Sequence, residues 1–178
     1  YLGDKRSETK FIKNKLEKNV NLNFVNKQNS PTIIKSRLVD KYSGSKLSAI
    51  YDLNDAEIDE KNENILINKL KNKIEKCDLI VITDYGHGLL TEKIINLVEQ
   101  KAKYLSLNIQ LNALNSSYQK IEKYRKADLI CLHERELQHY LKTRDKNNDN
   151  LISKLKKILK FKQIIITKGN KGSTLYSQ

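Results

Sequence analysis

The stretch that decides the fold runs Cys77-Asp78-Leu79-Ile80-Val81-Ile82-Thr83-Asp84-Tyr85-Gly86-His87-Gly88-Leu89-Leu90-Thr91. Its apolar run, Leu79 to Ile82, is short for a helix and rich in β-branched residues, so it is predicted to form a strand buried on both faces. Polar Asp84 ends the run, and Gly86 allows backbone conformations that other residues avoid. The stretch therefore begins as a strand and continues into a loop.

A helix is predicted to follow this loop. Thr91 can cap it, and the residues from Glu92 to Val98 form its first turns. In open parallel sheets, ligands bind in the crevice outside the carboxyl ends of the strands. The segment from Asp84 to Gly88 is therefore the first candidate for chemistry.

Three more short apolar runs predict strands, and charged segments with apolar residues at helical spacing predict helices between them. The strands are expected at Tyr104 to Asn108, Asp128 to Leu132 and Gln163 to Thr167. The helices are expected at Asp55 to Lys76, Tyr118 to Arg125 and Leu151 to Leu159. Strands that alternate with helices predict a parallel sheet with right-handed crossovers.

The amino-terminal third has a different pattern. Ser7 to Asn19 predicts an amphipathic surface helix, and Asn21 to Val25 alternates polar and apolar residues as a strand does. Between Pro31 and Asp52, two strand-like runs flank a turn that contains Gly44. This segment is predicted to be an antiparallel hairpin.

Two cations on the hairpin are candidates for binding an anion. Lys35 and Arg37 are two residues apart, so on a strand their side chains emerge from the same face and can hold one anionic group together. The alternative is a solvated strand whose charges discourage aggregation. The sequence favours neither interpretation.

Composition narrows the function classes. The chain has 34 basic and 21 acidic residues and a net charge of +13, which permits an anionic partner. The charge is dispersed and forms no stripe that could follow a phosphate backbone, so we expect no nucleic-acid partner. We find no signal peptide and no run of the ~20 apolar residues that span a bilayer, so we expect a cytoplasmic protein without a membrane partner.

Cys77 and Cys131 lack metal-ligand spacing and are expected to be buried thiols.

Polar residues also follow the other predicted strands. Asn108 to Asn112 carries amides and no charges. Glu136 lies in the first turn of a predicted helix, where it can face the crevice or complement the positive end of the helix. Thr167-Lys168-Gly169-Asn170-Lys171-Gly172 contains two glycines that let backbone N–H groups approach a phosphate, although an ordinary turn has the same composition.

Together these segments resemble ribokinase-like sugar kinases of the PfkB family, in their order and approximate spacing. The resemblance rests on Pro31-Thr32-Ile33-Ile34-Lys35-Ser36-Arg37, Asp84-Tyr85-Gly86-His87-Gly88, a strand that ends near Asn108, the strand-end Glu136, and the segment from Thr167 to Gly172. It is closest to heptose-phosphate kinases and to the kinase half of bifunctional nucleotidyltransferase/sugar kinases. It implies an α/β, ribokinase-like fold, in which helices flank a parallel sheet and an antiparallel lid hairpin spans about residues 31–52.

The resemblance also implies roles in a kinase that uses ATP and magnesium. The residues that would bind the sugar or sugar phosphate are Lys35, Arg37, Asp84 and Gly86. The residues that would bind ATP are Asn108, Thr167, Gly169 and Gly172. Glu136 would organise the magnesium ion. The lid implies a homodimer contact, and the bifunctional relatives imply a fused nucleotidyltransferase domain.

Two departures from the family pattern bear on activity. His133 stands where the family usually has Asn or Asp. The sequence has no counterpart of the family's Gly-x-Gly-Asp segment, which carries the catalytic base, so no catalytic residue is assigned. Residues 1–178 are therefore expected to be an internal part of one kinase domain and inactive by themselves. The alternative is a non-catalytic binding or assembly module of the same fold.

Overall fold

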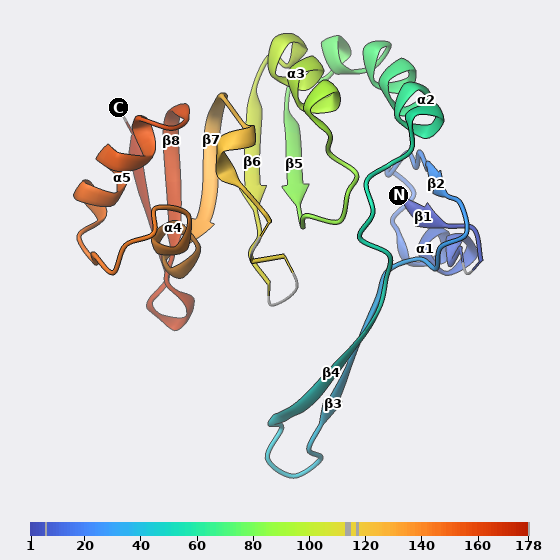
Figure 1. Cartoon of the computed structure of the whole chain (residues 1–178), viewed down its shortest axis with the longest axis horizontal. Helices are drawn as coiled ribbons and strands as arrows, with labels where there is room; N and C mark the ends of the chain where they lie inside the picture. Colours follow the sequence, from blue (N-terminus) through green and yellow to red (C-terminus); the bar gives the residue numbers. More distant parts are fainter. Residues whose placement is uncertain (6, 113–114, 117, 178) are drawn as a thin grey trace. The chain divides into compact units, whose positions relative to one another are not determined.

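The computed structural model describes residues 1–5, 7–112, 115–116 and 118–177 (Figure 1). The chain divides into two compact units, Tyr1–Leu66 and Ile67–Gln178. Each unit has its own sheet structure.

The second unit contains a five-stranded sheet with the strand order β5-β6-β7-β8-β9 (Figure 1). The strands are β5 (Ile80–Asp84), β6 (Leu105–Ile109), β7 (Lys126–His133), β8 (Lys160–Thr167) and β9 (Ser173–Ser177). The first four are parallel to one another, and β9 pairs antiparallel with β8. The prediction of an α/β fold with a parallel sheet is confirmed.

Helices pack on one face of this sheet. They are α3 (Glu92–Lys101), α4 (Glu134–Tyr140) and α5 (Asn148–Lys156). Thr91 caps α3 as predicted, because its hydroxyl accepts a hydrogen bond from the Ile94 N–H at 3.4 Å. The buried cluster that joins helices and sheet includes Ile95, Val98, Leu137, Leu151, Leu155, Leu107, Ile130, Leu132, Ile164 and Ile166. Among the helices that the structure describes, none is long and apolar enough to cross a bilayer.

The second face of the sheet is more open, which corrects the prediction for the strand from Leu79 to Ile82. Ile82 faces the helices and is 7% exposed, but Leu79 is 52% exposed and Val81 is 58% exposed. Strand β5 is at the edge of this sheet, and alternate residues point to opposite faces. Burial on both faces was therefore the wrong prediction.

The segment from Tyr118 to Arg125 is not the predicted helix. Within it, only Ile121–Lys123 forms a short 3₁₀ turn, η2. Ile121 and Tyr124 are fully buried, so the apolar spacing reflects packing of an irregular segment against the sheet. Further short turns are η1 (Ile74–Lys76) and η3 (Gly169–Lys171).

Both cysteines are free thiols. Cys77 is exposed, so the prediction that it is buried is wrong, whereas Cys131 is half-buried on β7. Burial, assisted by the negative charge of Glu136, raises the pKa of the Cys131 thiol.

The first unit begins with a short parallel pair, β1 (Leu2–Gly3) and β2 (Asn26–Lys27). The predicted amphipathic helix exists but is shorter than expected, as α1 (Thr9–Lys15). Asn21 to Val25 is not a strand, which corrects that prediction. The strand that pairs with Leu2 and Gly3 forms instead at Asn26 and Lys27, directly after the predicted segment. Pairing with β1 determines where this strand forms, and alternation of polar and apolar residues alone does not.

The predicted hairpin is confirmed as β3 (Ile34–Val39) and β4 (Lys46–Asp52), which pair antiparallel (Figure 1). In its turn, Gly44 has φ +67°, a conformation that L-residues rarely adopt. Helix α2 (Glu60–Lys71) follows, and it begins later than predicted.

Candidate functional site at the carboxyl ends of the strands

Four of the predicted site residues meet at one edge of the five-stranded sheet. Asn108 pairs with Thr83 on β5 and with Cys131 on β7, and His133 at the end of β7 pairs with Thr167 at the end of β8. The strands are parallel, so their carboxyl ends share that edge. Asp84, Asn108 and Thr167 therefore lie at or near the carboxyl ends of their strands, and Glu136 follows β7, at a common edge of the sheet.

The two faces of the sheet divide these side chains. Asp84 is in register with Ile109 and lies on the face that packs against the helices. Asn108 and Thr167 lie on the other face, in register with Cys131 and His133. The structure thus brings Asn108 and Thr167 to the open face and turns Asp84 away from it.

Asp84 is buried, with 4% of its surface exposed. The Lys123 ammonium lies 2.6 Å from its carboxylate, the Tyr124 hydroxyl donates a hydrogen bond to it at 2.8 Å, and the Gly86 N–H donates another at 2.9 Å. Burial acts to raise the pKa of Asp84, but Lys123 and these hydrogen bonds outweigh burial and the pKa is lowered. The carboxylate is therefore a charged internal anchor for the loop that follows β5.

Asn115 connects two of the strand-end loops. It is fully buried, and its amide nitrogen donates to the carbonyl of Tyr85 at 2.8 Å and to that of Gln110 at 3.0 Å. Its amide oxygen accepts from the Asn112 N–H at 2.8 Å. The loop after β5 and the loop after β6 are therefore held together by one side chain, whose amide group is satisfied internally.

Glu136 binds backbone groups of two neighbouring segments. One carboxylate oxygen accepts from the Leu111 N–H at 3.0 Å and the other from the His133 N–H at 2.8 Å. His133 completes a capping box at the start of α4, because its Nδ1 accepts from the Arg135 N–H at 3.1 Å. His133, the departure from the family pattern, thus takes the role of an N-cap residue.

A hollow of about 440 Å³ lies beside Glu136 at this edge. It is lined by Leu111, Asn112, Ser116, His133, Arg135, Glu136 and His139. The His133 imidazole and the Arg135 guanidinium offer hydrogen-bond donors around a single carboxylate, whereas the His139 Nε2 lies 3.1 Å from the Ser116 carbonyl. The hollow therefore suits an anionic group better than a bare cation.

The glycines after β8 leave their backbone accessible. Gly169 has φ +60° and Gly172 has φ +81°, and a Cβ added at either position would meet nothing within 4 Å. Thr167 lies just before them, and its hydroxyl is 3.5 Å from the Leu132 carbonyl. The side-chain amide of Asn108 donates to the Cys131 carbonyl at 3.0 Å. The segment has the open backbone that close approach of a phosphate requires.

Lys35 and Arg37 lie in the other unit, on β3 of the hairpin, and both are exposed. Lys35 pairs with Tyr51 and Arg37 with Ala49, so the two cations share one face as predicted. The Lys35 ammonium is 4.7 Å from the centre of the Tyr51 ring. A hydrogen bond from Lys35, with the charges of Lys35, Lys46 and Arg37, lowers the pKa of Tyr51.

Among the described residues, no group of three His, Cys, Asp or Glu side chains could hold a metal ion. Magnesium is commonly held by one or two carboxylates together with the phosphates of a substrate. In the part of the chain that the structure describes, a single carboxylate such as Glu136 fits a magnesium ion that a nucleotide carries, and no cluster fits an ion held by protein alone.

Sequence reasoning missed four side chains of this network, which are Asn115, Gln119, Lys123 and Tyr124. The Gln119 amide donates to the Asp84 carbonyl at 3.3 Å, so Gln119, Lys123 and Tyr124 all contact Asp84 at the end of β5. Asn115 contacts Tyr85 in the loop that follows. Asn115 lies in the amide-rich segment that ends and follows β6, and this composition is the sequence signal that could have indicated its role. The other three lie in the segment wrongly predicted as a helix.

A family model described as "pfkB family carbohydrate kinase" matches residues 2–178. A bifunctional protein HldE from Nitratiruptor sp. is 27% identical over 158 residues, which are 87% of this chain and 32% of that protein. Across the curated relatives that it matches, the chain spans about a quarter to a third of their length.

Solved structures show the same fold. Ribokinase from Giardia lamblia superposes with a TM-score of 0.73 at 17% identity, covering 99% of this chain and 57% of that one. Arabidopsis thaliana ribokinase complexed with ribose and ATP superposes with a TM-score of 0.61 at 17% identity, covering 99% of this chain and 56% of that one. The ribokinase-like fold expected from the sequence is confirmed.

Proposed function

Because this chain belongs to the pfkB family of carbohydrate kinases, we propose that it forms part of an enzyme that transfers a phosphoryl group from ATP to a hydroxyl of a sugar or sugar phosphate. The family match carries the proposal. The shared edge of the sheet supports it, since phosphoryl transfer depends mainly on positioning and on neutralising charge.

We assign the nucleotide to the side of β8. Thr167, Gly169 and Gly172 would approach the phosphates through backbone and hydroxyl donors, and Asn108 lies on the same open face. Glu136 would act on a magnesium ion that the nucleotide carries, as a single carboxylate already oriented by two backbone N–H groups. The ion would neutralise phosphate charge.

We assign the acceptor to the loop after β5, and we propose a separate substrate-binding role for two cations of the hairpin. Gly86 would line the acceptor side through its backbone. Asp84 would contribute indirectly, by holding this loop in position, because its carboxylate is buried and bound to Lys123 and Tyr124. Lys35 and Arg37 would bind the sugar or its phosphate from the cationic face of β3.

Nucleotide binding by the purified chain tests the assignment. Addition of ATP and magnesium is expected to shift the backbone amide resonances of Thr167, Gly169 and Gly172 in an ¹⁵N correlation spectrum. A Gly172→Val variant, which adds a side chain at φ +81°, is expected to weaken ATP binding at least about tenfold. Gly44→Val, at φ +67° on the hairpin turn, is the matched control and should bind ATP as the parent does.

Phosphoryl transfer is a separate measurement. We expect the 178 residues alone to show no sugar-dependent release of ADP, because their sequence has no Gly-x-Gly-Asp segment. A longer protein that contains this chain and that segment is expected to release ADP with a pentose, hexose or heptose, or with one of their phosphates. Sugar-dependent turnover by the 178 residues would contradict the first expectation.

The alternative, a non-catalytic binding module, is favoured by one observation. Asp84 and Glu136, the carboxylates to which we assign roles at this edge, both have internal partners. A longer protein that binds ATP but transfers no phosphate to any sugar of the panel would establish this alternative.

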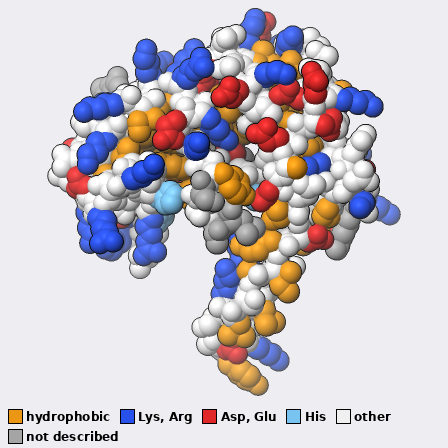
Figure 2. Space-filling model, viewed as in Figure 1, with side chains coloured by type: hydrophobic (Ala, Val, Ile, Leu, Met, Phe, Trp, Pro, Cys, Tyr) orange, Lys and Arg blue, Asp and Glu red, His pale blue; other side chains and the backbone are white. Residues whose placement is uncertain are grey.

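We propose that the hairpin also pairs two copies of the chain. Register places Leu38 and Ile50 on the face opposite the two cations, and they are 63% and 72% exposed. Figure 2 shows hydrophobic side chains along this hairpin. Exposed apolar side chains of this extent favour a protein interface.

The oligomeric state checks this pairing. Light scattering on a sizing column is expected to give the mass of a dimer for the parent chain and of a monomer for Ile50→Asp. The control is Ala49→Asp, which adds the same charge on the opposite face and should leave the dimer intact. A monomeric parent, or equal dissociation by both variants, would refute the interface.

A further inference from the structure

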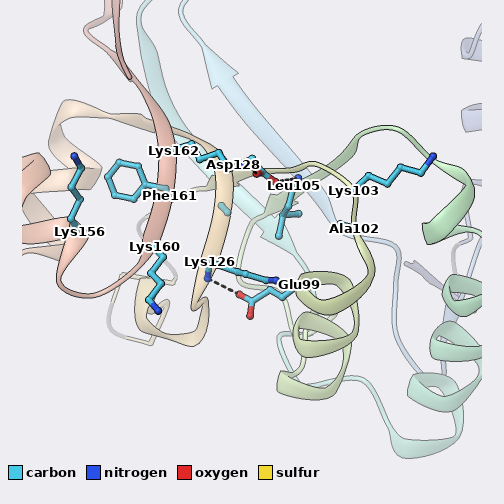
Figure 3. A pocket seen from close by; sticks show the side chains of 11 residues that line it. Glu99, Ala102, Lys103, Leu105, Lys126, Asp128, Lys156, Lys160, Phe161 and Lys162 are labelled. Atoms are coloured by element: carbon cyan, nitrogen blue, oxygen red, sulfur yellow. Dashed lines mark hydrogen bonds and ion pairs between the residues drawn. The ribbon is translucent and has the colours of Figure 1, made fainter. Parts of the chain in front are cut away.

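A hollow of about 600 Å³ lies at the opposite edge of the five-stranded sheet from the candidate site (Figure 3). Its lining includes the first residues of three parallel strands, Leu105 of β6, Lys126 of β7 and Lys160 of β8. The end of α3 closes one side through Glu99 and Ala102. We call it the amino-edge hollow.

Lysines dominate the amino-edge hollow. Five lysines and two carboxylates line it, namely Lys103, Lys126, Lys156, Lys160, Lys162, Glu99 and Asp128. An adjoining hollow of about 490 Å³ shares Glu99, Lys126, Lys156 and Lys160, and its further charged residues are Arg125, Lys157 and Glu122. Cationic side chains therefore outnumber carboxylates around both cavities.

The two carboxylates already have partners. Glu99 is 6% exposed and accepts hydrogen bonds from the N–H groups of Arg125 at 2.7 Å and Lys126 at 3.3 Å. Asp128 pairs with the Lys162 ammonium at 2.7 Å and accepts from the Leu105 N–H at 2.8 Å. Among the described residues, neither carboxylate forms an ion pair with Lys126, Lys156 or Lys160.

Three of the lysines form no ion pair within the described part of the chain, although the charge of one of them, Lys126, helps to lower the pKa of Asp128. They are Lys126, Lys156 and Lys160, all of them exposed. Lys103 differs, because it pairs with Asp78 at 3.1 Å and extends away from the other lysines in Figure 3. Lys156 ends α5, where a cation complements the helix dipole. Lys126 and Lys160 begin strands, so no helix dipole accounts for the cationic side chains at these two positions.

We propose that the amino-edge hollow binds a small, multiply phosphorylated anion. Lysine ammonium groups bind phosphate as point charges, and a bound anion would relieve the repulsion among them. The volume is in the range of small-molecule sites, and the adjoining hollow places cations around more than one phosphate group.

A nucleic-acid backbone fits this surface less well than a small anion. Backbone binding needs a continuous basic stripe. Figure 2 shows lysine and arginine side chains scattered among acidic ones over the face that it draws. The amino-edge hollow itself is interrupted by Glu99 and Asp128.

Calorimetric titration of the purified chain with inorganic triphosphate at low salt tests the proposal. The double variant Lys126→Gln/Lys160→Gln is expected to bind triphosphate about tenfold more weakly than the parent. The matched control, Lys10→Gln/Lys13→Gln, removes the same charge from exposed positions of α1 and should change the affinity less than about twofold. Lys156→Gln provides a second, single-site variant on the surface of α5.

Amide resonances locate the bound anion. Triphosphate is expected to shift those of Ala102, Leu105 and Phe161, which line the amino-edge hollow. Shifts confined to the segment from Thr167 to Gly172, equal weakening by the control pair, or tighter binding of a single-stranded oligonucleotide would each overturn the proposal. If ATP does not shift the amide resonances of the segment from Thr167 to Gly172, that result counts against the kinase assignment and not against the amino-edge hollow. Failure of one proposal is therefore distinguishable from failure of the other.

Discussion

Asp84→Asn is expected to lower the free energy of unfolding by about 3 kcal/mol, because it removes the charge from a buried ion pair and leaves the other partner behind. The carboxylate is 4% exposed and the Lys123 side chain is 23% exposed, so the abandoned ammonium is largely shielded from water. Tyr124 also loses a charged acceptor at 2.8 Å. Urea unfolding followed by far-ultraviolet circular dichroism measures the loss, since the chain has no tryptophan.

A second ion pair of the same sheet supplies the control. Asp128 pairs with Lys162 at 2.7 Å, but the Lys162 side chain is 73% exposed. Asp128→Asn is therefore expected to cost clearly less than Asp84→Asn, because water screens the exposed partner. Equal losses for the two variants would show that Asp84 is not the internal anchor that the geometry indicates.

The pH dependence gives the same anchor an independent test. The folded-state pKa of Asp84 is lowered, so its stabilising contribution is complete above the unfolded pKa of about 3.9 and is lost as the pH falls through the folded value. The difference in unfolding free energy between the parent and Asp84→Asn should be constant from about pH 5 to 7 and shrink below about pH 4. A difference that grows in acid would contradict the direction of the shift.

Local sequence pattern predicts the elements of this fold well. Short apolar runs followed by polar or glycine residues define β5 to β8, since side-chain burial and turn chemistry act over a few residues. The same logic places Thr91 at a helix cap and Gly44 in a turn. It fails for Leu79 and Val81, because exposure of a strand face depends on which layers cover the sheet.

The candidate site was only partly predictable, because its polar network joins residues far apart in the sequence. Asp84 contacts Lys123 and Tyr124, which lie about forty residues later in the sequence. No local pattern indicates that a strand-end carboxylate turns inward to meet them. The long-range contact of Glu136 was not predictable either. It belongs to the capping box of α4, as one interpretation of the sequence allowed, and it also accepts from the Leu111 N–H on the neighbouring loop.

The loop after β5 depends on a glycine for two separate reasons, and Gly86→Ala tests both. Gly86 has φ +69°, and a Cβ there would lie 3.0 Å from the Asn115 amide nitrogen and 3.2 Å from the Gln119 side chain. Left-handed strain costs about 1 to 2 kcal/mol and overpacking a comparable amount. Because Asn115 is buried and hydrogen-bonded to Tyr85 and Gln110, it cannot move aside without breaking those bonds. We expect a total loss of about 3 kcal/mol in unfolding free energy.

Gly169→Ala separates the two costs. Gly169 has φ +60°, nearly the same backbone conformation, but a Cβ there meets nothing within 4 Å. It should therefore lose only the backbone term, about 1 kcal/mol. The excess loss of Gly86→Ala then measures the contacts of the added Cβ with Asn115 and Gln119. That excess should shrink in an Asn115→Ala background, which removes the 3.0 Å contact with the amide nitrogen and leaves the 3.2 Å contacts with the Cβ of residue 115 and with Gln119, because residues in contact are energetically coupled. An excess that is unchanged there would mean that the amide of Asn115 is not what obstructs the added side chain.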